Sequence, residues 1–87
     1  MKAISNTNKN ISAFISSDLS LVAAILVTRK AQLVDTKKIS PFRFEFSLTP
    51  ADVCYELKNL YVNGQLSLPV DAVADKIRLL KSLMKAE

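Results

Sequence analysis

The sequence contains few side chains that could catalyse a reaction. Among its 87 residues there is no histidine, one cysteine (Cys54) and one glycine. Without histidine, the chain lacks the side chain whose ordinary pKa suits proton transfer near neutral pH, and a single glycine excludes a glycine-rich phosphate loop. Cys54 falls on the apolar side of an expected helix, which favours a buried structural thiol over a nucleophile. A lone cysteine also excludes an internal disulfide, and a structural zinc site is not expected.

Two pairs of carboxylates are spaced four residues apart, as one face of a helix requires: Asp52 with Glu56, and Asp71 with Asp75. Such pairs can bind a cation or act as acid and base. Both pairs lie near the starts of expected helices, where negative charge stabilises the helix dipole. We therefore expect no enzyme activity, no bound metal and no cofactor.

Basic side chains are more informative than acidic ones. Twelve lysines and arginines against eight acids give a net charge of +4. A basic surface binds nucleic-acid phosphates through the release of counterions. However, +4 is a modest charge, and scattered lysines often serve only solubility. Contact with DNA or RNA is therefore an alternative that we do not favour. Its candidate phosphate contacts are Lys37, Lys38, Arg43, Arg78 and Lys85.

The clearest local signal is the alternation in "FRFEFSL", residues 42–48. Phe42, Phe44, Phe46 and Leu48 would point to one side of a half-buried strand. Residues 31–38 can pair with it as the first arm of a hairpin, with the turn in "KKISP". The aromatic face should be covered by helices.

A nine-residue run, Leu19 to Val27, is apolar apart from one serine and is too short to span a membrane. Asp18 suits the start of a helix, and the pair Ala23-Ala24 favours a helix over a strand. Arg29 and Lys30 would fall in its last turn. We predict a helix over 18–29 that is covered on more than one side.

Two further helices follow. The first has Thr49 as its N-cap, Pro50 at its first position and Gly64 as a left-handed C-cap. The second spans 70–85 and carries two apolar ridges, which implies two partners. Its first ridge should pack inside the chain; it consists of Val70, Val73, Ile77, Leu80 and Met84. The second ridge, Ala72, Leu79 and Leu83, is the candidate oligomer interface.

The predicted fold is therefore α+β, in the order β-α-β-β-α-α. A small antiparallel hairpin, which a strand within 11–16 can widen, packs against three helices. Residues 1–10 are polar and read as a flexible N-terminal arm, and residues 11–87 form a single domain. A chain of this size buries a small core, so a partner subunit is the remaining route to extra stability.

Four stretches resemble a family of small uncharacterised bacterial and phage proteins, across about residues 12–84: "SSDLSLVAAILV", "FRFEF", "LKNLYVNGQL" and "VDAVADKIRLLKSLM". In that family a Ser-Asp-Leu motif opens an Ala-rich helix and an Asn-Gly turn ends a later one. Ser17, Asp18 and Leu19 match the first motif, and Asn63-Gly64 matches the second. Members often have a glycine where this chain has Arg29-Lys30. The resemblance implies the same element order and a phage or bacterial source, but no activity.

Three functions are compatible with these features. The favoured one is a non-enzymatic binding module that forms a homo-oligomer in the cytoplasm (of a host, if the protein is viral). The first alternative is a basic accessory protein on DNA or RNA phosphates. The second is a phage counter-defence protein that binds a host protein or a small anionic ligand. We expect no membrane partner.

Overall fold

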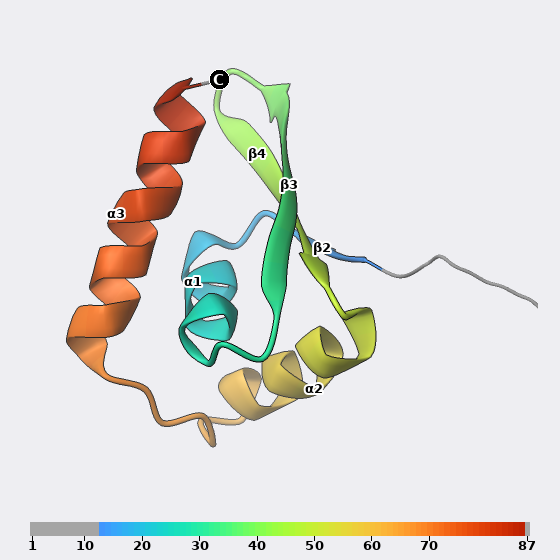
Figure 1. Cartoon of the computed structure of the whole chain (residues 1–87), viewed down its shortest axis with the longest axis vertical. Coiled ribbons are helices and arrows are strands. Elements are labelled where there is room, and N and C mark those ends of the chain that lie inside the picture. The colour runs from blue at the N-terminus through green and yellow to red at the C-terminus, as the bar shows by residue number, and fades with distance from the viewer. Residues whose placement is uncertain (1–12, 87) are drawn as a thin grey trace, which may run out of the picture.

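The computed structural model of the protein describes residues 13–86. It confirms the α+β class and the predicted order β-α-β-β-α-α. The expected N-terminal arm, residues 1–10, lies outside the described residues. In chain order the elements are β2 (Phe14–Ser16), α1 (Leu19–Val27), β3 (Gln32–Ser40), β4 (Arg43–Thr49), α2 (Ala51–Val62) and α3 (Val70–Ala86) (Figure 1).

The three strands form one antiparallel sheet in the order β2-β4-β3. The short strand β2 widens the hairpin, with Phe14 opposite Leu48 on β4. Along β4, Phe44, Phe46 and Leu48 are buried and the residues between them are more exposed. The predicted alternation is therefore confirmed for these three side chains.

Phe42 is the exception to that alternation. The turn between β3 and β4 consists of Pro41 and Phe42, with Ser40 paired to Arg43 across it. Because Phe42 lies in this turn and not in the strand, no helix covers its ring, which is 95% exposed. The prediction that Phe42 belongs to the buried aromatic face is wrong.

The first strand of the hairpin is longer than predicted and is irregular. β3 spans Gln32–Ser40, and its register with β4 shifts between Leu33 and Asp35 and again between Lys38 and Ser40. Since β3 lies at an edge of the sheet, these bulges and its lysines disfavour pairing with a further strand.

Helix α1 begins as predicted and ends earlier. The Asp18 carboxylate accepts a hydrogen bond from the Leu21 N–H (3.2 Å) and caps the first turn. The helix stops at Val27, so Arg29 and Lys30 lie beyond it, contrary to the expectation that they occupy its last turn. Arg29 has a φ of 63°, the left-handed conformation that ends a helix.

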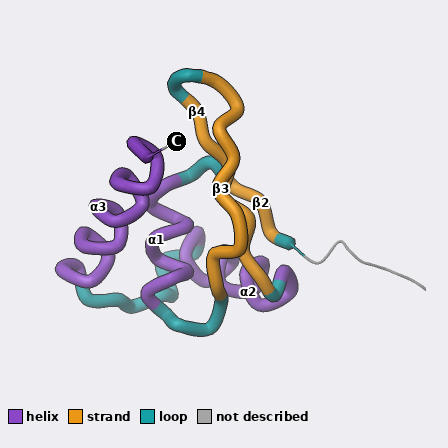
Figure 2. Tube along the Cα trace, turned by 45° about the horizontal axis from the view of Figure 1, so that its top comes forward, coloured by secondary structure: helices purple, strands orange, loops and turns teal. Residues whose placement is uncertain are grey.

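Helix α1 is the centre of the core. Figures 1 and 2 show it between α3 and the sheet, while α2 crosses the end of the sheet opposite the β3–β4 turn. This cover on several sides is what its apolar sequence predicted. Its buried side chains join those of the other elements in one cluster. The fully buried large residues are Phe46, Ile25, Leu48, Leu80, Val22 and Cys54.

Helix α2 starts one residue later than predicted, with Pro50 and not Thr49 as its N-cap. Its end agrees with the prediction. Gly64 has a φ of 69°, its N–H donates to the Tyr61 carbonyl, and the Gln65 N–H donates to the Leu60 carbonyl. These two bonds define a Schellman motif. No helix within residues 13–86 is long and apolar enough to cross a membrane.

Candidate functional site

Within residues 13–86, the side chains most capable of chemistry are divided between α2 and α3. Cys54 is completely buried on α2, as predicted. Burial raises the pKa of its thiol, and the negative charge of Asp52 raises it further. The neutral thiol is neither a good nucleophile nor a metal ligand. Within the described residues no three His, Cys, Asp or Glu side chains gather as a metal site would require.

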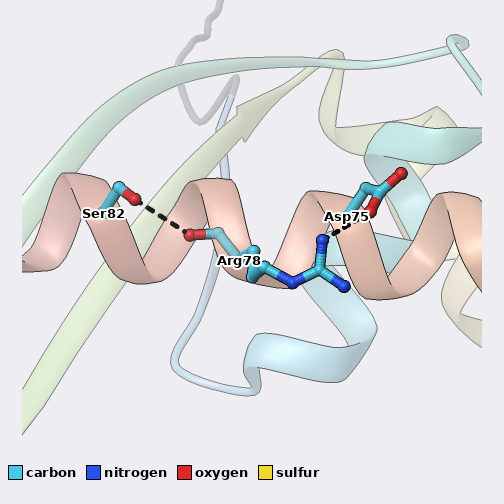
Figure 3. A network of polar contacts seen from close by, with 3 residues as sticks. All are labelled: Asp75, Arg78 and Ser82. Carbon is cyan, nitrogen blue, oxygen red and sulfur yellow. Dashed lines mark hydrogen bonds and ion pairs between the residues drawn. The ribbon is translucent and has the colours of Figure 1, made fainter.

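The two carboxylate pairs lie on exposed helix surfaces. Asp75 of the second pair accepts a hydrogen bond from the Arg78 guanidinium at 2.7 Å, and Ser82 donates to the Arg78 carbonyl (Figure 3). Both charged side chains of this ion pair are about 70% exposed, so solvent screens it. Asp75 is therefore part of a local α3 contact.

A groove of about 360 Å³ lies between the end of α1 and the first half of α3. Four of its lining residues are apolar and three are charged, and the charges are of both signs: Arg29, Lys76 and Asp75. Two of the predicted interface residues, Ala72 and Leu79, take part in it. The lining residues are Leu26, Val27, Arg29, Ala72, Asp75, Lys76 and Leu79.

The two ridges of α3 have different surroundings. Val73, Ile77 and Met84 pack against the core and Leu80 is buried within it, as predicted for the first ridge. The remaining member, Val70, is 80% exposed, because it is the first residue of α3 and precedes the turns that meet α1. That part of the prediction is wrong.

The second ridge is partly open to solvent, and two of its three residues, Ala72 and Leu79, line the groove. Leu79 is 52% exposed and Leu83 is 37% exposed, while Ala72 is half-buried. At 100° per residue, Ala72, Leu79 and Leu83 lie within one narrow sector of the helix surface. We call these three residues the α3 flank.

The candidate phosphate contacts are split between two places. Lys37 and Lys38 lie within β3 and not in the turn, with Lys37 opposite Glu45 and Lys38 opposite Phe44. Arg43 begins β4, and its Nε donates to the Ser17 hydroxyl at 3.2 Å. The turn itself is shorter than the expected "KKISP".

Lys85 and Arg78 both lie on α3 but differ in position. The C-terminal end of α3, which carries Lys85 in its last turn, lies at the same end of the molecule as the β3–β4 turn (Figures 1 and 2). Arg78 lies between the groove residues Lys76 and Leu79 in the chain and is engaged with Asp75. The fold therefore places Lys85, and not Arg78, at the end occupied by the hairpin cations.

Phe42 is the surface residue that the sequence reasoning missed. The signal was present, because Pro41 favours a turn and a residue next to it can fall outside the strand. The alternation of phenylalanines hid that signal.

Comparisons of the chain with protein-family models, with curated proteins and with solved structures find no match. The resemblance to small bacterial and phage proteins therefore stays a prediction.

Proposed function

We propose that the protein is a non-enzymatic binding module that acts as a homodimer joined through the α3 flank. The observation that carries this proposal is the exposure of Leu79 and Leu83 at a groove that Leu79 lines together with apolar and charged residues. Adjacent large apolar side chains on a small protein commonly mark a site of association. A second copy of the chain would cover these exposed leucines. It would also add buried apolar surface to a chain that is short enough to bury only a small core.

The charges at the groove favour a symmetric pair over an unrelated partner. A two-fold interface brings the same patch of both subunits together, so the patch must be complementary to itself. The groove lining meets this requirement, because it carries Arg29 and Lys76 as well as Asp75. A rotated copy would bring its Asp75 carboxylate to these cations, and the solvent-exposed contact of Asp75 with Arg78 would be shared or exchanged for the new one. Such pairs set orientation more than affinity, which the leucines would provide.

The test is the solution mass by light scattering on a sizing column in moderate salt. We expect twice the chain mass of 9.6 kDa. Leu79→Asp should give monomers, because the new charge would lose its water in the interface. Leu83→Asp should do the same and lower the melting temperature, since Leu83 is more buried.

Val70→Asp is the matched control. It adds the same charge to the same helix at an exposed residue that does not line the groove, and the negative charge suits the helix N-terminus. This variant should stay dimeric. A monomeric wild-type chain, or dimers of Leu79→Asp and Leu83→Asp with unchanged melting temperatures, would contradict the proposal.

A second candidate function is the binding of nucleic-acid phosphates by the hairpin end of the molecule. It is favoured by the position of the last turn of α3, which carries Lys85, at the end of the molecule where the β3–β4 hairpin with Lys37, Lys38 and Arg43 closes. We call these four residues the basic end. Affinity for a labelled oligonucleotide should fall steeply between low and moderate salt. A hydrophobic self-interface should persist as the salt concentration rises.

A further inference from the structure

The most unusual side chain of the surface is Phe42. The other phenylalanines of the chain (Phe14, Phe44 and Phe46) are buried, whereas the Phe42 ring is almost fully exposed at the tip of the hairpin. Figure 2 shows this hairpin extending beyond the helices. The turn has its own support, since the Ser40 hydroxyl accepts a hydrogen bond from the Phe42 N–H (3.3 Å). The fold itself gains no burial from the ring.

The surroundings of this ring are basic. Arg43 is its neighbour in the chain, and Lys37 and Lys38 are exposed on the adjoining strand. The Arg43 side chain is oriented by the hydrogen bond that its Nε donates to the Ser17 hydroxyl. Across the hairpin, Glu45 lies in register with Lys37. The tip of the hairpin therefore combines an exposed aromatic ring with the adjoining Arg43, and two exposed lysines lie further along β3.

We propose that Phe42 stacks on an unpaired base of a single-stranded nucleic acid whose phosphates are bound by the basic end. This inference rests on the second candidate function. Every base offers a flat face to an aromatic ring, so stacking needs no particular sequence, and nearby cations hold the backbone. The hairpin provides both groups within a few residues of each other.

Other ligands for an aromatic tip fit less well. Insertion into a duplex must first unstack two base pairs, and proteins that do this repay the cost with extensive contacts along the bent DNA. This tip offers one ring and a few cations. Stable attachment to a membrane needs more apolar area than one ring and the half-exposed Ile39 supply. The bases of a single strand are already accessible, so binding one requires less free energy from this small site than opening a duplex does.

The experiment uses the absence of tryptophan from the sequence. Phe42→Trp places a single tryptophan at the tip, where its emission can be excited apart from the two tyrosines. Titration with oligothymidylate in low salt should quench this emission in a saturable way, and added salt should reverse the quenching. The control, Val70→Trp, places the same reporter at another exposed residue near the opposite end of α3. Its emission should not change.

Anisotropy of a labelled oligothymidylate measures affinity independently of the tryptophan. Phe42→Ala should weaken binding by about 5- to 150-fold, the range that the loss of one stacked base implies. Removal of Lys37, Lys38 or Arg43 should also weaken binding, and it should flatten the salt dependence, which Phe42→Ala should leave unchanged. Neither change at Phe42 should affect folding, because the ring is exposed.

The possible failures are distinguishable. If oligothymidylate binds Phe42→Ala as tightly as wild type and leaves the Phe42→Trp emission unchanged, stacking is wrong and phosphate binding stands. If it does not bind the wild type at low salt, both proposals fail. Tighter binding to a duplex of the same length overturns the choice of a single strand. A blue shift of the Phe42→Trp emission with anionic vesicles, but no response to oligothymidylate, would identify a membrane as the ligand instead.

Discussion

At the residue scale, position in the chain decides what a side chain contributes. Phe42 and Phe46 share a residue type and an alternating pattern, but one lies in a turn and the other in the central strand β4. Phe46 is 1% exposed and belongs to the core cluster. Phe42 therefore adds nothing to stability by burial, and its ring is free to serve a ligand.

The same substitution at both positions tests this difference. Phe46→Leu should lower the free energy of unfolding by about 1–3 kcal/mol, because it removes buried ring atoms and leaves a cavity. Phe42→Leu should change it by less than about 0.5 kcal/mol. Urea unfolding followed by circular dichroism measures both values. A large loss for Phe42→Leu would show that the tip is packed in solution.

At the element scale, two helices end in the same way with different residues. α1 and α2 are both followed by a residue with positive φ, which is Arg29 after α1 and Gly64 after α2. A side chain in this conformation costs about 1–2 kcal/mol, which glycine avoids. Beside Arg29, the Thr28 hydroxyl donates to the Ile25 carbonyl (2.6 Å) and accepts from the Lys30 N–H (3.2 Å). This local support helps to hold the strained residue.

Substitutions of the positive-φ residue at these two helix ends should therefore change the stability of the chain in opposite directions. Arg29→Gly should stabilise the chain by about 0.5 kcal/mol, since relief of strain exceeds the added freedom of the unfolded chain. Gly64→Ala should destabilise it by about 1 kcal/mol through the backbone alone, because an added Cβ would meet no atom within 4 Å.

Lys30→Gly is the control for Arg29→Gly, because Lys30 does not have a positive φ. It should not stabilise the chain. Thermal unfolding of the three variants under one set of conditions measures the differences. Equal effects of Arg29→Gly and Lys30→Gly would contradict the role given to the left-handed residue.

At the scale of the whole molecule, the groove and the basic end lie in different parts of the structure. The groove is formed by the end of α1 with the first half of α3, and the basic end is formed by the hairpin with the last turn of α3. In Figure 1 the end of α1 and the β3–β4 turn lie toward opposite ends of α3. A dimer joined at the groove would therefore leave both hairpins open, and two copies could bind one strand together.

A dimer should also show itself in thermal stability. Folding coupled to association makes the melting temperature depend on protein concentration. We expect a rise of about 4 °C for each tenfold increase in concentration of the wild-type chain. Leu79→Asp should abolish this rise and Val70→Asp should retain it. A melting temperature that is the same at all concentrations would indicate that the chain folds as a monomer.

The sequence by itself determined the elements and most of the core. Local signals were sufficient for this, because the Asp18 cap, the alternation along β4 and the Asn63-Gly64 turn act over a few residues. The burial of Cys54 could likewise be predicted from the apolar stripe of its helix. The candidate interface could be named from the width of the apolar surface on α3.

Only the tertiary structure decided which surfaces those elements leave open. The exposure of Phe42 depends on where the turn closes, the groove depends on how α1 meets α3, and the proximity of Lys85 to the hairpin end depends on the direction of α3. Periodicity describes one element at a time, so it cannot report contacts between residues far apart in the chain. The physical reason is that a side chain is exposed only where no other helix or strand packs over it, and the packing of helices and strands is set by the tertiary structure.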